Sequence, residues 1–324
     1  MAVSKSPVLL LGFNRPELAE HVFQAIRAYE PHQLFIAVDG ARVEFAADID
    51  KVSRMQAFAS RVDWDCDVQT LFRTHNKGCQ FAVEEAINWY FDHVERGIIL
   101  EDDCVPHPSF FHFCDQMLER YDDDLRIMSI SGESYPGSWL ETCDASYSFS
   151  CYALIWGWAT WRRAWKLHDS SMSTWHHNTE NGWLERFFRR KSVYEYWLEK
   201  LSLTENNHGY TWDYQWVYSS WINSGLCVIP TKNLVTNIGC GADATHTMNG
   251  NWAMANRATE SMSFPLLHPD CVRRDFLLDE SLEAARLEIN DDEADCELKS
   301  RSGNSLISRF VRGLRRLAES TRSL

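Results

Sequence analysis

The stretch Gly97–Asp103 limits the possible folds more than any other part of the sequence, because three apolar residues run directly into three acids. A short continuous apolar run is typical of a strand buried on both faces. Such a strand would carry Glu101, Asp102 and Asp103 to its carboxyl end, where open α/β sheets bind ligands. Adjacent buried acids repel one another, and Mg²⁺ or Mn²⁺ would relieve that conflict. A solvated acidic turn is the alternative, but the preceding strand and the following aromatic segment favour a metal site.

Apolar runs alternate with helix-like segments over the first half of the chain. Strands are predicted at 8–11, 34–38, 68–72 and 97–100, and later at 127–130 and 225–230. Apolar residues between the first four runs repeat at helical spacing. Strands that alternate with helices indicate βαβ units. We therefore predict an α/β fold with a Rossmann-like mixed, mainly parallel sheet flanked by helices.

Polar side chains follow each of the first four predicted strands. Because the carboxyl ends of parallel strands meet at one edge of a sheet, we expect these side chains to lie together. Cations beside a carboxylate–metal centre favour a ligand that carries phosphates, although each basic residue alone is more often a surface charge. The residues are Asn14 and Arg15 after the first strand, Asp39 after the second, Arg73, His75 and Lys77 after the third, and Asp102 and Asp103 after the fourth.

Composition and missing motifs exclude several classes of protein. No GxGxxG follows the first strand, which disfavours a dinucleotide-binding fold, and the absence of GxxxxGK followed by Ser or Thr excludes a P-loop. The net charge of −14 argues against nucleic-acid binding. The ten cysteines form no CxxC pair, and no apolar segment resembles a secretory signal or a membrane span. We therefore expect a cytoplasmic protein with reduced thiols.

The second half of the chain is rich in tryptophan, since 12 of the 14 lie between Trp139 and Trp252. Tryptophan faces can stack on sugar rings, but we expect most of these residues to belong to the core. Asp213 stands between Trp212 and Tyr214. An apolar environment raises the pKa of a carboxylate and makes it a better base, whereas a local capping role is the alternative.

Two further features lie toward the C-terminus. His246 follows a glycine-containing segment, and its imidazole could complete a metal shell, although a lone histidine is more often structural. The segment Leu306–Leu317 has an apolar face opposite a face with four arginines, which is typical of a short basic amphipathic helix. Such a helix would contact an anionic membrane surface or a partner, or would pack on the domain.

These motifs together resemble GT-A glycosyltransferases, most closely the branch related to N-acetylglucosaminyltransferase I. The resemblance covers about residues 7–250. It depends on an ordered set: the basic segment 73–78, a helix, the strand that ends in the acidic triplet, and an aromatic helix from about Pro106. Similar bacterial proteins make surface polysaccharides or glycolipids. The tail after about Phe264 and the missing N-terminal membrane anchor depart from the animal enzymes, which leaves the acceptor open.

The resemblance implies a nucleotide-sugar donor whose diphosphate is bridged by Mn²⁺ or Mg²⁺. In this pattern Asp103 is the metal ligand, Asp102 lies beside the donor ribose or sugar, and Glu101 lies near the sugar. Arg15 would approach the nucleotide, and Asp39 would meet a uracil-type base.

The same resemblance assigns residues in the second half of the chain. The segment Trp212-Asp213 matches the one that carries the catalytic base of an inverting transferase. Gly157 and Trp158 fall where the family lines the acceptor side. We therefore predict that Asp213 is catalytic and that Gly157 and Trp158 contribute to binding.

The resulting hypothesis is a metal-dependent GT-A glycosyltransferase that moves a sugar, in particular from a UDP-sugar, to a hydroxyl of a glycan or glycolipid. Residues 1–265 would form the transferase domain, with a nucleotide-sugar half over about 1–130 and an acceptor half over 131–265. Residues 266–324 would add an acidic segment and the basic helix, for peripheral contact with the inner face of a membrane.

Two alternatives remain open. A sugar-phosphate nucleotidylyltransferase is disfavoured because the first strand is not followed by a Gly-rich loop. A non-catalytic nucleotide- or glycan-binding protein is disfavoured because Asp103 and Asp213 are retained, and pure binding needs no base.

Overall fold

Four apolar runs in the first part of the chain form neighbouring strands of one sheet. They are β1 (Val8–Gly12), β2 (Gln33–Val38), β3 (Asp67–Phe72) and β4 (Arg96–Glu101). β1 lies between β2 and β4 and pairs with both in parallel, and β3 pairs in parallel with β2. These runs therefore form the parallel strands that their pattern predicts.

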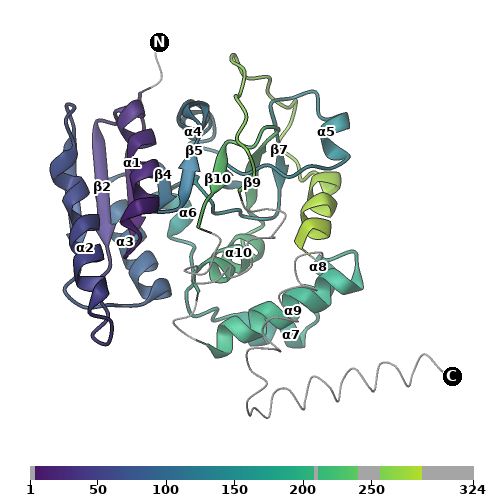
Figure 1. Cartoon of the computed structure of the whole chain (residues 1–324). Helices are drawn as coiled ribbons and strands as arrows, with labels where there is room; N and C mark the ends of the chain where they lie inside the picture. The colour runs from purple at the N-terminus through teal and green to yellow at the C-terminus, as the bar shows by residue number, and fades with distance from the viewer. Residues whose placement is uncertain (1–3, 208–210, 240–255, 287–324) are drawn as a thin grey trace. The chain divides into compact units, whose positions relative to one another are not determined.

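The computed structural model describes residues 4–207, 211–239 and 256–286 (Figure 1). The chain divides into two units, Met1–Leu282 and Glu283–Leu324, and the sheet belongs to the first. His246 and the segment 306–317 lie outside the described residues. The functional division into a donor half, an acceptor half and a tail from residue 266 stays a prediction.

Within the described residues the sheet has eight strands in the order β3-β2-β1-β4-β8-β6-β9-β7. The later strands are β6 (Ile127–Ser131), β7 (Tyr147–Ser150), β8 (Trp158–Trp161) and β9 (Leu226–Pro230). β8 is antiparallel to both β4 and β6, and β7 is antiparallel to β9. The prediction of a mixed, mainly parallel sheet is confirmed. A second, small sheet pairs β5 (Cys104–Pro106) with β10 (Val235–Asn237) in antiparallel orientation.

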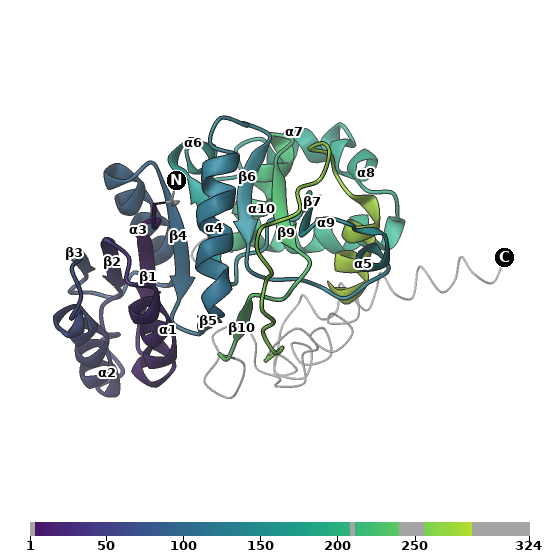
Figure 2. The ribbon, with the colours of Figure 1, turned by 90° about the horizontal axis from the view of Figure 1, so that it is seen from above.

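Helices flank the large sheet, and Figure 2 shows α1 and α4 beside each other. No helix among the described residues has both the length and the apolar character needed to cross a membrane. The helices are α1 (Pro16–Tyr29), α2 (Ala47–Gln56), the 3₁₀ helix η1 (Ala57–Arg61), α3 (Cys79–His93), α4 (Pro108–Arg120), α5 (Trp139–Thr142), α6 (Arg162–Trp165), α7 (Trp175–Glu180), α8 (Trp183–Phe187), α9 (Lys191–Asn206) and α10 (Asp213–Ile222).

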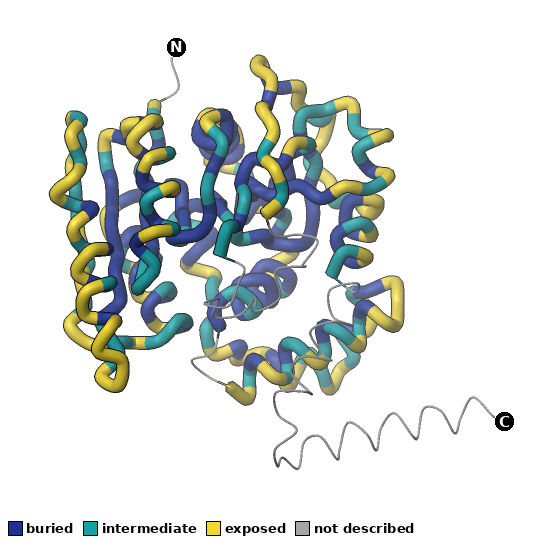
Figure 3. Tube along the Cα trace, in the orientation of Figure 1, coloured by how far each residue is buried: buried dark blue, intermediate teal, exposed yellow. Residues whose placement is uncertain are grey.

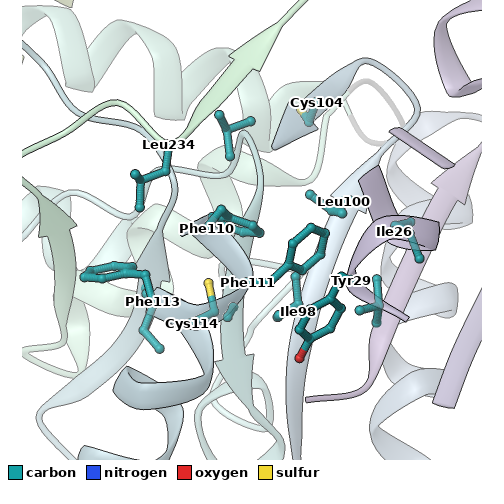
Figure 4. Packing of buried hydrophobic residues seen from close by; sticks show 14 of the residues in the cluster. Ile26, Tyr29, Ile98, Leu100, Cys104, Phe110, Phe111, Phe113, Cys114 and Leu234 are labelled. Carbon is teal, nitrogen blue, oxygen red and sulfur yellow. The ribbon is translucent and has the colours of Figure 1, made fainter. Parts of the chain in front are cut away.

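Alternate residues of the central strands point to opposite faces of the sheet. Ile98 and Leu100 of β4 share one apolar cluster with Phe110 of α4 (Figure 4). Phe35 of β2 instead contacts Tyr90 of α3, with ring centroids 4.9 Å apart. Both faces are therefore covered, and Figure 3 shows the central strands as buried. Burying a large apolar side chain contributes about 1.5–3 kcal/mol, which explains why these runs are continuously apolar.

The tryptophan-rich segment supplies a strand that the sequence pattern did not predict. β8 is short and buried at all four of its positions, so it shows no alternation of polar and apolar residues. Nine of the described tryptophans between Trp139 and Trp252 are buried, which agrees with the expectation that most of them are core residues.

Candidate active site

The order of the sheet reverses at β1, because β2 and β3 lie on one side of it and β4 on the other. Open α/β sheets bind ligands outside the carboxyl ends of their strands at such a switch point. Leu11 of β1 is paired with Glu101 of β4, so the loops after the two strands begin side by side. One loop carries Arg15 and the other carries the rest of the acidic triplet. The topology therefore locates a candidate site where the sequence predicts one.

The guanidinium of Arg15 joins two acids of the triplet. Its Nη2 forms an ion pair with Oδ1 of Asp102, and its Nη1 lies 2.9 Å from Oδ2 of Asp103. The backbone N–H of Phe13 donates a longer hydrogen bond, 3.4 Å, to Oδ2 of Asp102. The Asp102 and Asp103 side chains are only 3% and 10% exposed. The arginine therefore balances part of a buried negative charge.

The remaining charge in the triplet is poorly compensated. Burial, together with the charges of Asp103 and Asp102, raises the pKa of Glu101 to about 8, against the effect of Arg15. Burial also raises the pKa of Asp102 to about 6, although the charge of Arg15 opposes that rise. Oε1 of Glu101 is buried and has no hydrogen-bond partner among the described residues. Additional positive charge at this centre would favour the ionised form of the acids.

The carboxylate oxygens of the triplet are the type of ligand atom that a hard divalent cation prefers. Mg²⁺ and Mn²⁺ prefer oxygen ligands and are usually held by one or two carboxylates together with substrate phosphates. In the described part of the chain, no group of three or more His, Cys, Asp or Glu side chains is arranged to hold a metal ion. Asp103 stays the predicted ligand. The predicted contribution of His246 falls outside the described residues.

Asp213 is the first residue of α10 and lies within electrostatic range of Glu101. Its negative charge contributes to the raised pKa of Glu101. The hydroxyl of Thr211 donates a hydrogen bond to Oδ1 of Asp213. Nε2 of Gln215 donates to the carbonyl of Thr211 at 2.7 Å, which fixes the start of the helix. The fold thus brings together the predicted base and the predicted metal centre from opposite halves of the sequence.

Cys79 lies in the same neighbourhood, although no sequence motif pointed to it. It is the first residue of α3, and burial, with the charges of Glu101 and Asp213, raises the pKa of its thiol to about 12. A thiol that stays protonated at neutral pH is a poor nucleophile. Cys79 therefore lines the centre without offering a thiolate. The only sequence signal for it was its position directly after the basic segment 73–78.

The carboxylate of Asp39 accepts several hydrogen bonds from nearby residues of the protein. Oδ1 accepts hydrogen bonds from the backbone N–H groups of Gly40 and Lys77 at 2.9 and 3.0 Å. Oδ2 accepts from Gly78 N–H at 3.2 Å and from Nδ2 of Asn76 at 2.9 Å. Asp39 thus anchors the segment before α3 to the end of β2. Its predicted contact with a nucleobase stays a prediction.

The other predicted polar residues make contacts away from the triplet. Arg73 and Lys77 both pair with Glu85 of α3, at 3.4 and 3.3 Å. Asn14 donates through Nδ2 to Oδ1 of Asp48 at 2.7 Å. Arg15 is therefore the predicted basic residue that forms ion pairs with the triplet in the described part of the chain. Phosphate contacts of Arg73 and Lys77, and a ligand contact of Asn14, stay predictions.

Gly157 precedes β8, and Trp158 is the first residue of that strand and pairs with Ile99 of β4. The carbonyl of Gly157 accepts a hydrogen bond from Gly132 N–H at 2.8 Å, and its φ of 64° suits glycine. Trp158 is 0% exposed, and its ring is stacked on Trp212 with centroids 5.7 Å apart. Trp212 is also buried, at 2% exposure, so neither ring offers a free face to a ligand. The contribution of Gly157 and Trp158 to the acceptor side stays a prediction.

The small sheet brings a glycine against the predicted metal ligand, which sequence reasoning missed. The N–H of Ile238, directly after β10, donates to the backbone carbonyl of Asp103 at 2.9 Å. A Cβ atom on Gly239 would lie 2.0 Å from Oδ2 of Asp103. Glycine is therefore needed for the chain to pass this close to the carboxylate. The pairing of β5 with β10 is non-local, so no local sequence pattern indicates it.

Comparisons with known proteins give only remote structural likeness. No protein-family model matches the sequence. No curated protein matches it either. HddC from Yersinia pseudotuberculosis is similar over 49% of this chain and 77% of its own, with 8% identity and a TM-score of 0.30. UDP-glucose pyrophosphorylase complexed with UDP-glucose is similar over 46% of this chain and 64% of its own, less than two thirds, with 10% identity and a TM-score of 0.26. Likeness this low carries no argument about function.

Proposed function

We propose that this chain is a metal-dependent glycosyltransferase that moves a sugar from a nucleotide-diphosphate donor to a hydroxyl group of a glycan or glycolipid. The observation that carries the proposal is the convergence at the β1–β4 switch point. Arg15 contacts two acids there, and a separate carboxylate, Asp213, lies close enough to influence Glu101. A cation held at this centre, beside a second carboxylate, would supply what metal-dependent inverting sugar transfer requires.

The donor side of the proposed reaction is electrostatic. Asp103, with Asp102 beside it, would hold Mg²⁺ or Mn²⁺, and the guanidinium of Arg15 offers two parallel N–H donors that suit a diphosphate. When bound, the cation supplies Lewis-acid stabilisation of the charge that develops on the leaving diphosphate. The family resemblance supports UDP as the nucleotide.

The acceptor side of the proposed reaction depends on Asp213. The acceptor oxygen forms a bond to the anomeric carbon while the bond from that carbon to the diphosphate oxygen breaks. Asp213 takes the proton of the acceptor hydroxyl as the new bond forms, and attack opposite the leaving group inverts the anomeric carbon. The hydrogen bond from Thr211 holds the base in a fixed orientation.

Two assays on the full-length chain test this function. The first measures thermal stability with UDP-glucose, UDP-galactose and UDP-N-acetylglucosamine, each with Mn²⁺ or with EDTA. A ligand at a hundred times its Kd stabilises the folded state by about 2.7 kcal/mol. The second follows release of UDP and gain of one sugar by an added acceptor. Stabilisation without turnover would indicate a binding protein. Pyrophosphate release from UTP and a sugar phosphate would indicate a nucleotidylyltransferase.

The base is tested by Asp213→Asn, which preserves the size of the side chain but removes its basicity. We expect kcat to fall by about 10²–10⁴-fold, with the Kd of the donor almost unchanged. Thr211→Val, which keeps the carboxylate but removes its hydrogen bond, should have a smaller effect on kcat. A loss confined to KM would mean that Asp213 only positions the acceptor. Glu133 is the alternative base, because it follows β6, another strand of the same sheet. Loss of turnover in Glu133→Gln but not in Asp213→Asn would assign the base to Glu133.

A further inference from the structure

The predicted metal ligand already has a cationic partner in the protein. Nη1 of Arg15 lies 2.9 Å from Oδ2 of Asp103, and the same guanidinium pairs with Asp102. The other oxygen of Asp103, Oδ1, faces the Sγ of Cys104 at 3.4 Å. A divalent cation that approached Asp103 would therefore meet a positive charge bound to the same carboxylate.

We propose that Arg15 is an internal counter-ion that competes with the divalent cation for Asp103 until a diphosphate binds. In the free protein, Arg15 weakens binding of the cation alone, because two positive charges would share one carboxylate. A bound diphosphate brings enough negative charge to accept both the cation and the guanidinium. The cation and the nucleotide diphosphate would therefore bind cooperatively, and by linkage each would tighten the other by the same factor. The diphosphate part of this inference depends on the proposed function.

The contacts of Arg15 suit a residue that changes partners. Its side chain is 22% exposed, and among the described residues its ion pairs go to Asp102 and Asp103. It precedes α1 at the N-cap position but forms no side-chain capping hydrogen bond. Arg163 provides a contrast, because its guanidinium donates to four backbone carbonyls and is fixed by them. Release of Arg15 from the acids would break no side-chain hydrogen bond to the described backbone.

Binding of Mn²⁺ to the full-length chain tests the inference directly. Calorimetry and the electron paramagnetic resonance signal of free Mn²⁺ give its Kd, first alone and then with saturating UDP. For the wild type we expect UDP to tighten Mn²⁺ binding within the usual range of coupling, about 5–150-fold. For Arg15→Gln we expect Mn²⁺ alone to bind several-fold more tightly than it binds to the wild type. The factor by which UDP tightens Mn²⁺ binding should decrease by roughly the same amount. Arg15→Lys keeps the charge but loses the planar guanidinium with its two parallel N–H donors. Its Kd for Mn²⁺ should lie between those of the wild type and Arg15→Gln.

The control is Arg61→Gln, which removes another arginine from the first half of the chain. Arg61 forms a two-pronged ion pair with Glu20 on the surface, so its loss should leave Mn²⁺ binding unchanged. Thermal unfolding verifies that each variant is folded, and Mn²⁺ alone should raise the Tm of Arg15→Gln more than that of the wild type. Equal or weaker binding of Mn²⁺ alone by folded Arg15→Gln would overturn the inference. Failure of UDP to bind would instead count against the proposed function, since the comparison with Mn²⁺ alone needs no nucleotide.

Discussion

The carboxylate of Asp103 is confined on two sides. Arg15 contacts its Oδ2, and the backbone at Gly239 passes against the same oxygen. Both neighbours come from parts of the sequence far from the acidic triplet, one after β1 and one after β10. The position of Asp103 therefore depends on steric fit as well as on charge.

Gly239→Ala tests the steric part of this arrangement. The added Cβ would lie 2.0 Å from Oδ2 and 2.6 Å from Cγ of Asp103, so the carboxylate must move. We expect binding of Mn²⁺ in the presence of UDP to weaken by at least about tenfold, which corresponds to about 1.4 kcal/mol. Calorimetry measures this effect. Gly182→Ala is the control, because its Cβ would meet Arg186 and its φ of 68° costs stability without touching Asp103. Equal Mn²⁺ affinity in Gly239→Ala and the wild type would contradict the prediction.

The sequence located the acidic triplet and Arg15 because both follow apolar strands, and parallel strands end at one edge. It could not show which cation would reach the acids. Arg73 and Lys77 follow β3 at the same edge, yet they pair with Glu85. That choice depends on the position of α3 relative to the strands, which no local pattern contains.

Buried acids also tie together the elements that carry the site. Asp39 joins the end of β2 to the segment before α3. Asp48, near the start of α2, accepts hydrogen bonds from Asn14 after β1 and from Arg42 after β2. These contacts give the sheet edge a fixed shape. Asn14 and Asp39 were predicted to contact a ligand, since a single sequence cannot separate a polar residue that binds a ligand from one that binds the protein itself.

Asp39→Asn should loosen the segment before α3. An amide replaces one acceptor oxygen with an NH₂ group. At the Oδ2 position this group cannot accept from the N–H of Gly78, and it leaves the N–H of Lys77 with Oδ1 as its one acceptor on this side chain. We expect the free energy of unfolding to fall by about 1–3 kcal/mol, and hydrogen exchange at these two amides to accelerate. Denaturant unfolding and exchange followed by mass spectrometry measure both effects. Asp63→Asn, at an exposed ion pair with Arg27, is the control. Unchanged exchange at Lys77 and Gly78 would count against an anchoring role.

Asp48 predicts a dependence of stability on pH. Its hydrogen bond from Arg42 lowers the pKa of Asp48 from 3.8 to about 2. A lowered pKa in the folded state means that the stabilisation is complete above about pH 4 and is lost as the pH falls toward 2. Asp48→Asn should therefore be less stable than the wild type at pH 7 by about 1–2 kcal/mol, with a gap that narrows on acidification. Urea unfolding at pH 7, 5, 4 and 3 measures this gap. A constant gap over that range would mean that packing, not charge, explains the loss.

For the whole molecule, the most important contacts are those that cover the edge strand β7. β7 is an edge strand, and the segment 274–279 covers it. The N–H of Asp275 donates to the carbonyl of Phe149, and the hydroxyls of Ser148 and Ser150 donate to Asp275 and Asp279. The structural unit accordingly continues to Leu282. The first four strands could be predicted from local apolar runs. The contacts that cover β7 are non-local and polar, so no apolar pattern predicts them.

Truncation after residue 286 tests whether the first unit is sufficient. The shortened chain keeps all strands of the described residues and the segment over β7, so we expect cooperative unfolding with a Tm close to that of the full chain, together with retained binding of UDP and Mn²⁺. Truncation after residue 271 removes the contacts of Asp275 and Asp279 and leaves the edge of β7 open, so that variant should be less stable and prone to aggregate.

Truncation after residue 286 also removes the predicted basic helix at 306–317. Each arginine near an anionic surface contributes about 1 kcal/mol, and salt screens that attraction. Co-sedimentation with phosphatidylserine vesicles at low salt should therefore be lost after truncation at 286, while the fold is kept. If co-sedimentation persisted, the membrane contact would have to come from the first unit, and the 306–317 helix would be left with a role in packing or in partner binding.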